Sequence, residues 1–74
     1  MPTITVTFGW PDNPRHHSAV FPISATIDLF CDHNVTEIID NQTGEVYKHY
    51  TRIAGEMVCR INPAVFRLYK ELGF

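Results

Sequence analysis

The sequence predicts a small α+β domain, in which an antiparallel sheet of four to five strands, arranged much like a meander, is packed by one short C-terminal helix. Two observations lead to this prediction. Apolar and polar residues alternate in several short segments, which is typical of half-buried strands, and turn-forming residues separate these segments. Near the C-terminus the spacing of apolar residues changes to that of an amphipathic helix.

The first half of the chain contains three strand-like segments. Residues 3–8 alternate strictly between threonines and apolar residues, many of them β-branched, which predicts a half-buried strand. Residues 19–21 resume an apolar run that Pro22 interrupts, and because proline cannot donate to a sheet, this segment is expected at an edge or a bulge. Residues 25–31 are predicted to form the next strand, with alternating faces.

The second half predicts three further strands joined by short turns. Residues 35–40 and 45–53 are expected to pair through the connection 41–44, whose last residue is a glycine that can adopt a positive φ. Residues 54–55, Ala-Gly, break the second of these strands. Residues 56–61 then form the last strand.

The C-terminal helix has the clearest local signals in the chain. Asn62 is a favoured N-cap, Pro63 suits the first helical position, and Gly73 provides a C-terminal stop. Phe74 is expected to pack back on the last turn. The apolar stripe of this helix consists of Val65, Leu68, Tyr69 and Leu72. A helix this short is marginal alone, so it must dock on the sheet.

Length and composition indicate one folded domain, residues 1–74, without intrinsic disorder: 45% of the residues are hydrophobic and 19% are charged. The net charge of −2 argues against a generally basic nucleic-acid binder. The charge is nevertheless uneven. Residues 1–45 carry one Arg against six acidic residues, a net −5, and residues 46–74 carry five basic against two acidic residues, a net +3. The two halves either neutralise each other across paired strands or form a two-signed surface that orients a partner.

The N-terminus lacks the basic and apolar regions of a signal peptide, and no run of apolar residues is long enough to span a bilayer. A cytoplasmic location, no membrane contact and two reduced cysteines are therefore expected. Cys31 and Cys59 fall on apolar faces of predicted strands, which favours core positions for both. The protein is expected to be a monomer or a weak homodimer.

The loop of residues 9–18 is the most informative segment for function. It is long for a chain of 74 residues, and it holds the only tryptophan and two of the four histidines. Trp10 either continues the apolar face of residues 3–8 and closes the core, or lies outside it as an anchor for a protein partner. Arg15, His16 and His17 would then flank the anchor. These histidines are either simply solvated, or they make binding sensitive to pH between about 5 and 8.

The segment 47–52 interleaves aromatic and basic residues. Lys48, Tyr50 and Arg52 alternate onto one face of the predicted strand, and Arg60 could join them. Aromatic residues beside cations are how sheet surfaces bind single-stranded nucleic acid, so this segment is the alternative functional site. The structural explanation is an ordinary strand whose tyrosines pack against neighbouring strands.

Motifs that would indicate catalysis or metal binding are weak in this sequence. Cys31 and His33 offer two ligand types close together, but a zinc site usually shows two such pairs, and no nucleophile, phosphate-loop or metalloprotease motif occurs. A metal-binding or enzymatic domain is therefore the third hypothesis. We expect no enzyme activity, no metal and no cofactor.

The leading hypothesis is a non-enzymatic, protein-binding regulator or inhibitor that docks on a larger complex through the loop 9–18, the adjoining strand edges, or both. Open sheet edges also permit strand addition to a partner. Transcription machinery is named as the larger complex from context rather than from particular residues. A nucleic-acid-binding module remains the alternative.

Overall fold

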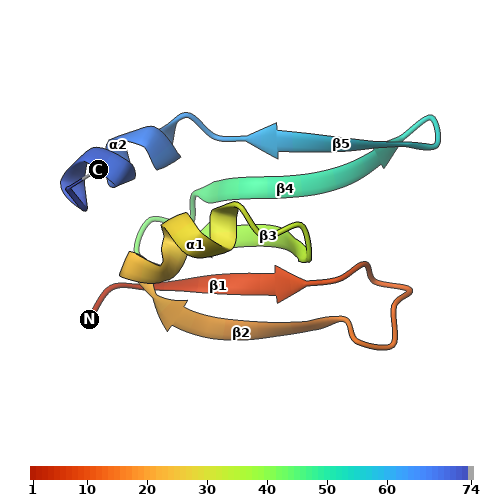
Figure 1. Ribbon diagram of the computed structural model, residues 1–74, viewed down its shortest axis with the longest axis horizontal. Helices are drawn as coiled ribbons and strands as arrows, with labels where there is room; N and C mark the ends of the chain where they lie inside the picture. The colour runs from red at the N-terminus through yellow and green to blue at the C-terminus, as the bar shows by residue number, and fades with distance from the viewer. Residues whose placement is uncertain (74) are drawn as a thin grey trace.

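The computed structural model describes residues 1–73 and contains a five-stranded sheet with helices on one face (Figure 1). Every pair of neighbouring strands is antiparallel. The α+β class with a C-terminal helix, predicted from the sequence, is confirmed. The elements are, in chain order, β1 (Thr3–Phe8), β2 (His17–Pro22), a 3-10 turn η1 (Ile23–Ala25), α1 (Thr26–Phe30), β3 (Val35–Asp40), β4 (Val46–Ile53), β5 (Glu56–Ile61) and α2 (Ala64–Glu71).

The strand order is β2-β1-β3-β4-β5, so β1 lies between its hairpin partner β2 and the later strand β3. The chain must therefore pass over β1 to reach β3, and it does so through η1 and α1. Figure 1 shows α1 lying across the sheet beside β3, with α2 beyond the end of β5. From β3 onward the strands follow one another as simple hairpins, as predicted.

The prediction of a strand at residues 25–31 is wrong, because this segment contains helix α1. In so short a segment, apolar residues at 23, 27 and 30 also fit a helical period, and alternation alone cannot distinguish the two. Pro22 ends β2, and the hydroxyl of Thr26 then donates to the Ile23 carbonyl at 2.6 Å. Long-range packing of Leu29 and Phe30 against the core settles the helical form.

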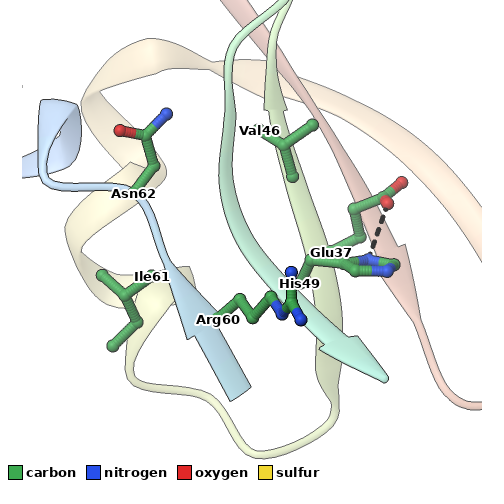
Figure 2. Close-up of a pocket in the computed structure, with 6 residues that line it drawn as sticks. All are labelled: Glu37, Val46, His49, Arg60, Ile61 and Asn62. Carbon is green, nitrogen blue, oxygen red and sulfur yellow. Dashed lines mark ion pairs between the residues drawn. The ribbon is translucent and has the colours of Figure 1, made fainter. Parts of the chain in front are cut away.

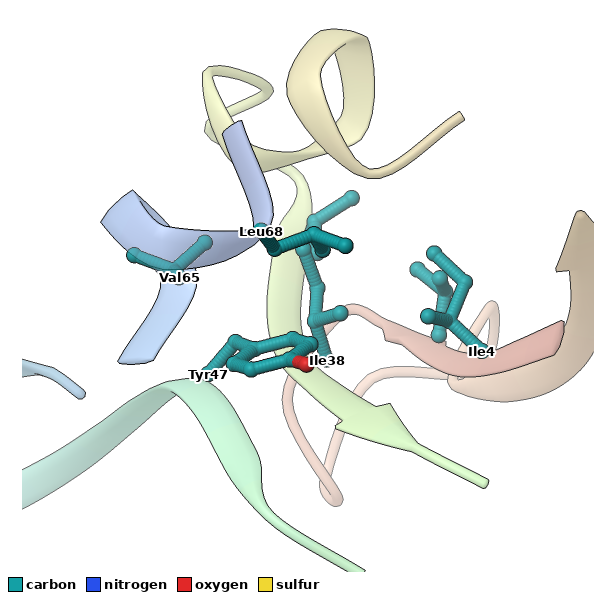
Figure 3. Close-up of a cluster of buried hydrophobic side chains, with 7 residues drawn as sticks. Ile4, Ile38, Tyr47, Val65 and Leu68 are labelled. Atoms are coloured by element: carbon teal, nitrogen blue, oxygen red, sulfur yellow. The ribbon is translucent and has the colours of Figure 1, made fainter. Parts of the chain in front are cut away.

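Both helices and one face of the sheet enclose the core (Figure 3). The buried apolar side chains are Ile4, Val6, Val35, Ile38, Tyr47, Val65 and Leu68. Each aliphatic side chain contributes about 1.5–3 kcal/mol by leaving water. The two residues from α2, Val65 and Leu68, belong to the predicted apolar stripe, and Tyr69 and Leu72 pack around them, so this stripe is confirmed.

The ends of α2 and the turns also agree with the sequence. The side-chain oxygen of Asn62 accepts the Ala64 N–H at 3.0 Å, and Gly73 adopts a φ of 91° just after the helix. The 41–44 and 54–55 connections are tight, and Gly44 has a φ of 76°. The contact predicted for Phe74 lies outside the described residues.

The prediction that both cysteines lie in the core is wrong. Cys31 follows α1 and is exposed, because the segment that contains it is not a strand. Cys59 lies on the face of β5 that corresponds to the core side of the sheet, but the helices do not extend over β5 and leave it exposed.

Candidate functional site

The loop between β1 and β2, residues 9–16, is held in place by hydrogen bonds. Gly9 adopts a φ of 77°, donates its N–H to the Asn34 carbonyl at 2.9 Å, and accepts a hydrogen bond from the Thr36 hydroxyl at 2.9 Å. Asn13 donates its N–H to the Trp10 carbonyl, and its own side chain accepts from Arg15 N–H, both at 2.9 Å. The loop is thus a pair of turns tied to the start of β3, and this fixes the position of Trp10.

Trp10 is partly buried and lies outside the hydrophobic core cluster. Its ring meets the ring of Tyr50 edge to face, with centroids 6.1 Å apart. The guanidinium carbon of Arg52 lies 5.2 Å from the centre of the Trp10 ring, in a cation–π arrangement. Strand β4 therefore supplies both neighbours of the tryptophan, from residues some forty positions later in the chain.

Trp10 lines a hollow of about 480 Å³ on the surface. Four strands and the loop contribute its walls, which are Thr7, Trp10, Pro11, His16, Ser18, Thr36, Glu37, His49, Tyr50, Thr51 and Arg52. We call this feature the Trp10 hollow. Its charged groups have both signs, because Glu37 and Arg52 both line it. Glu37 also pairs with His49, with Oε2 2.9 Å from Nδ1.

Of the three residues predicted to flank Trp10, which are Arg15, His16 and His17, the structure places only one beside it. His16 lines the Trp10 hollow, and its Nδ1 lies 3.2 Å from the Gly9 carbonyl oxygen. Arg15 is exposed and is not part of the wall. His17 lies elsewhere, because its ring stacks on Phe8 with centroids 4.9 Å apart and planes 13° apart.

The residues of the alternative nucleic-acid site are divided by the structure. Lys48 is only 4% exposed, and its ammonium donates to the carbonyls of Phe30 at 2.8 Å and Asp32 at 3.0 Å. Burial lowers the pKa of this lysine. The ammonium stabilises the carboxyl end of α1 and is not presented to a phosphate.

Tyr50 and Arg52 do share a face of β4, as predicted, but they belong to the Trp10 hollow. Arg60 pairs in register with His49, so it points to the opposite face of the sheet from Tyr50. The four residues therefore do not form one basic surface.

A second hollow, of about 390 Å³, is lined in part by Glu37 and His49, which were not predicted as site residues from the sequence (Figure 2). Glu37 and His49 lie on its wall with Arg60, and Figure 2 shows the ion pair between the first two. The pair is formed by the register of β3 with β4, which places these two residues opposite each other. No local sequence signal reports that register.

The third hypothesis rested on Cys31 and His33, which are both exposed in the segment after α1. Within residues 1–73, no three or more His, Cys, Asp or Glu side chains gather as a metal site requires. In the same part of the chain, no helix combines the length and the apolar character needed to cross a membrane.

Comparison of the chain with protein families, with curated proteins and with solved structures finds no match. The function of the protein is therefore inferred from the geometry of the site alone.

Proposed function

We propose that this protein is a non-enzymatic binding module that regulates or inhibits a larger protein complex, and that it docks through the Trp10 hollow. The observation that carries the proposal is the environment of Trp10. A large aromatic ring is left partly exposed outside the core, beside Tyr50 and Arg52. Trp, Tyr and Arg are the three residue types most enriched at the energetic centres of protein interfaces.

The rigidity of the site supports the same function. Hydrogen bonds from Gly9 and Thr36 fix the loop before any partner arrives, so docking costs little conformational entropy. The hollow is also concave and carries both signs of charge, so a partner segment with an apolar side chain and flanking polar groups would complement it.

Single-stranded nucleic acid is a less suitable ligand for this hollow. Aromatic stacking on Trp10 and Tyr50 is available, but backbone phosphates require a continuous positive groove. Here Lys48 is buried, Arg60 lies on the opposite face of the sheet from Tyr50 and Arg52 and does not line the hollow, and Glu37 adds a negative charge to the wall. The transcription machinery named from the sequence stays a prediction about the larger complex.

The test is affinity capture from the cells that express the protein, with and without nuclease. The variant Arg52→Glu reverses an exposed charge at the hollow, and Arg67→Glu reverses an exposed charge on α2 as the matched control. We expect a stoichiometric protein that survives nuclease, is retained by the control, and is lost with Arg52→Glu and with Trp10→Ala.

The stability of Trp10→Ala is measured alongside by thermal unfolding. Because Trp10 is only partly buried, we expect a loss of about 1–2 kcal/mol, below the roughly 3–5 kcal/mol typical of a core tryptophan. An unfolded Trp10→Ala protein would show that Trp10 is a core residue. Capture of nucleic acid, with all protein lost after nuclease, would favour the alternative function.

A further inference from the structure

Strand β5 forms one edge of the sheet, and its outer side has no strand partner within residues 1–73 (Figure 1). Such an edge presents a row of free backbone N–H and C=O groups that can pair with another strand. The opposite edge, β2, ends in Pro22, which lacks an N–H. β5 contains no proline and all six of its residues are in register with β4, so it is a regular strand with a free edge.

Exposed apolar side chains gather beside this edge. Met57 on β5 is 59% exposed and Ile61 is 47% exposed. These two residues alternate onto the face that carries the helices, with Cys59 between them. Ile53 on β4 is 49% exposed as well, but it lies opposite Glu56 and therefore on the other face of the sheet, outside this patch. Burial of such a patch would stabilise an interface.

The other face of β5 carries complementary charges. Glu56 and Arg60 lie on this face at the two ends of the strand, with Val58 midway between them. Glu37, His49 and Arg60 form a row across three strands, because each is in register with the next. Arg60 ends this row at the free edge, and within residues 1–73 it forms no ion pair.

We propose that the protein forms a homodimer in which β5 pairs antiparallel with β5 of a second copy. In the register that centres on Val58, each Glu56 lies opposite Arg60 of the second copy, and Met57 lies opposite Cys59. A two-fold axis makes the contact self-complementary, so a strand with an acid at one end and a base at the other matches its own copy. Opposite charges facing each other across strands stabilise a sheet.

This inference is independent of the proposed function. The residues that line the Trp10 hollow include none from β5, so the Trp10 hollow of each copy remains open in the dimer. The dimer would therefore present two binding sites to a partner.

The experiment measures the mass of the protein in solution by sedimentation equilibrium, with a reductant present so that no disulfide forms. The wild-type protein is compared with Glu56→Arg and with Arg60→Glu, both at exposed positions. In a dimer of either variant, residues 56 and 60 carry the same charge and face each other at two places in the interface. We therefore expect the dimer dissociation constant to rise on the order of tenfold or more. Arg15→Glu, a charge reversal in the distant loop, should leave it unchanged.

A mixture of the two variants gives the decisive result. When Glu56→Arg meets Arg60→Glu, both facing pairs become opposite in charge again, so the mixture should form a heterodimer although each variant alone is weakened. If the wild-type protein stays monomeric over the whole concentration range, the proposal is overturned. A dimer that both variants retain, or that the mixture fails to restore, would equally rule out this register.

Discussion

At the scale of single residues, Asp40 shows how a buried charge is held in this small protein. Its carboxylate is 4% exposed and accepts hydrogen bonds from the Tyr47 hydroxyl, from the backbone and side chain of Gln42, and from the Thr43 N–H. Burial alone would raise the pKa of this carboxyl, but these hydrogen bonds outweigh it and hold the pKa below its usual value. Burial and the contact with Asp40 also raise the pKa of Tyr47.

The lowered pKa of Asp40 predicts a pH dependence of stability. Because the folded pKa lies below the unfolded one, the carboxylate contributes stability that is fully present above about pH 4 and is lost as the pH falls through the folded value. We expect Asp40→Asn to lower the free energy of unfolding by about 1–3 kcal/mol at neutral pH, and by less in acid. Urea unfolding at several pH values measures this difference.

The control for this series is Asp12→Asn, at an exposed loop position. A gap between wild type and Asp40→Asn that stays constant from neutral to acid pH would contradict the role given to the Asp40 carboxylate.

At the scale of elements, Lys48 links strand β4 to the carboxyl end of helix α1. The buried ammonium donates to the carbonyl of Phe30, the last residue of this short helix, at 2.8 Å, and to the Asp32 carbonyl just beyond the helix at 3.0 Å. We expect Lys48→Met to lower the free energy of unfolding by about 1–2 kcal/mol, because it leaves the Phe30 carbonyl without this donor. Amide exchange should accelerate most at the end of α1.

Lys70→Met, an exposed lysine on α2, serves as the control for Lys48→Met. The competing effect is that removing a buried charge relieves its desolvation. A Lys48→Met protein as stable as wild type would mean that this effect dominates and that α1 does not depend on the ammonium.

The β4–β5 hairpin contains the one non-glycine residue with a positive φ among residues 1–73. Ala54 has a φ of 53°, and with Gly55 at 82° both turn residues are left-handed. Asn-Gly is the preferred pair for such a turn, and alanine is disfavoured at its first position. We expect Ala54→Asn to raise the free energy of unfolding by about 0.5–1 kcal/mol.

Thermal unfolding measures the effect of Ala54→Asn, and the same change at Ala19, which is partly buried on the edge strand β2 and outside any left-handed turn, provides the comparison. A loss of stability for Ala54→Asn would contradict the strain assigned to this turn.

At the scale of the whole molecule, local signals predicted the elements that local interactions determine. Helix α2 was predictable because Asn62, Pro63 and the apolar stripe all lie within the helix or next to it. The two later hairpins were predictable because their turns contain glycines at positive φ. By contrast, α1 was missed because its helical form depends on packing and on Lys48, which is distant in the sequence.

The candidate site was predictable only in part, for the same reason. The loop and its tryptophan stand out in the sequence, but Tyr50 and Arg52 were assigned to the rival nucleic-acid surface. The sheet order, with β3 between β1 and β4, brings these residues to Trp10, and no local pattern reports a sheet order. The register of the strands also separates Arg60 from Tyr50 and Arg52.

The central claim, that a protein partner docks at Trp10, has one direct test. Trp10 is the only tryptophan, so incorporation of fluorotryptophan gives a single fluorine NMR resonance that reports on the hollow alone. We predict that the captured partner shifts this resonance, and that Arg52→Glu weakens the interaction when the same titration is repeated. A partner that binds the labelled protein in sedimentation while the resonance stays unchanged would place the docking surface elsewhere and contradict the proposal.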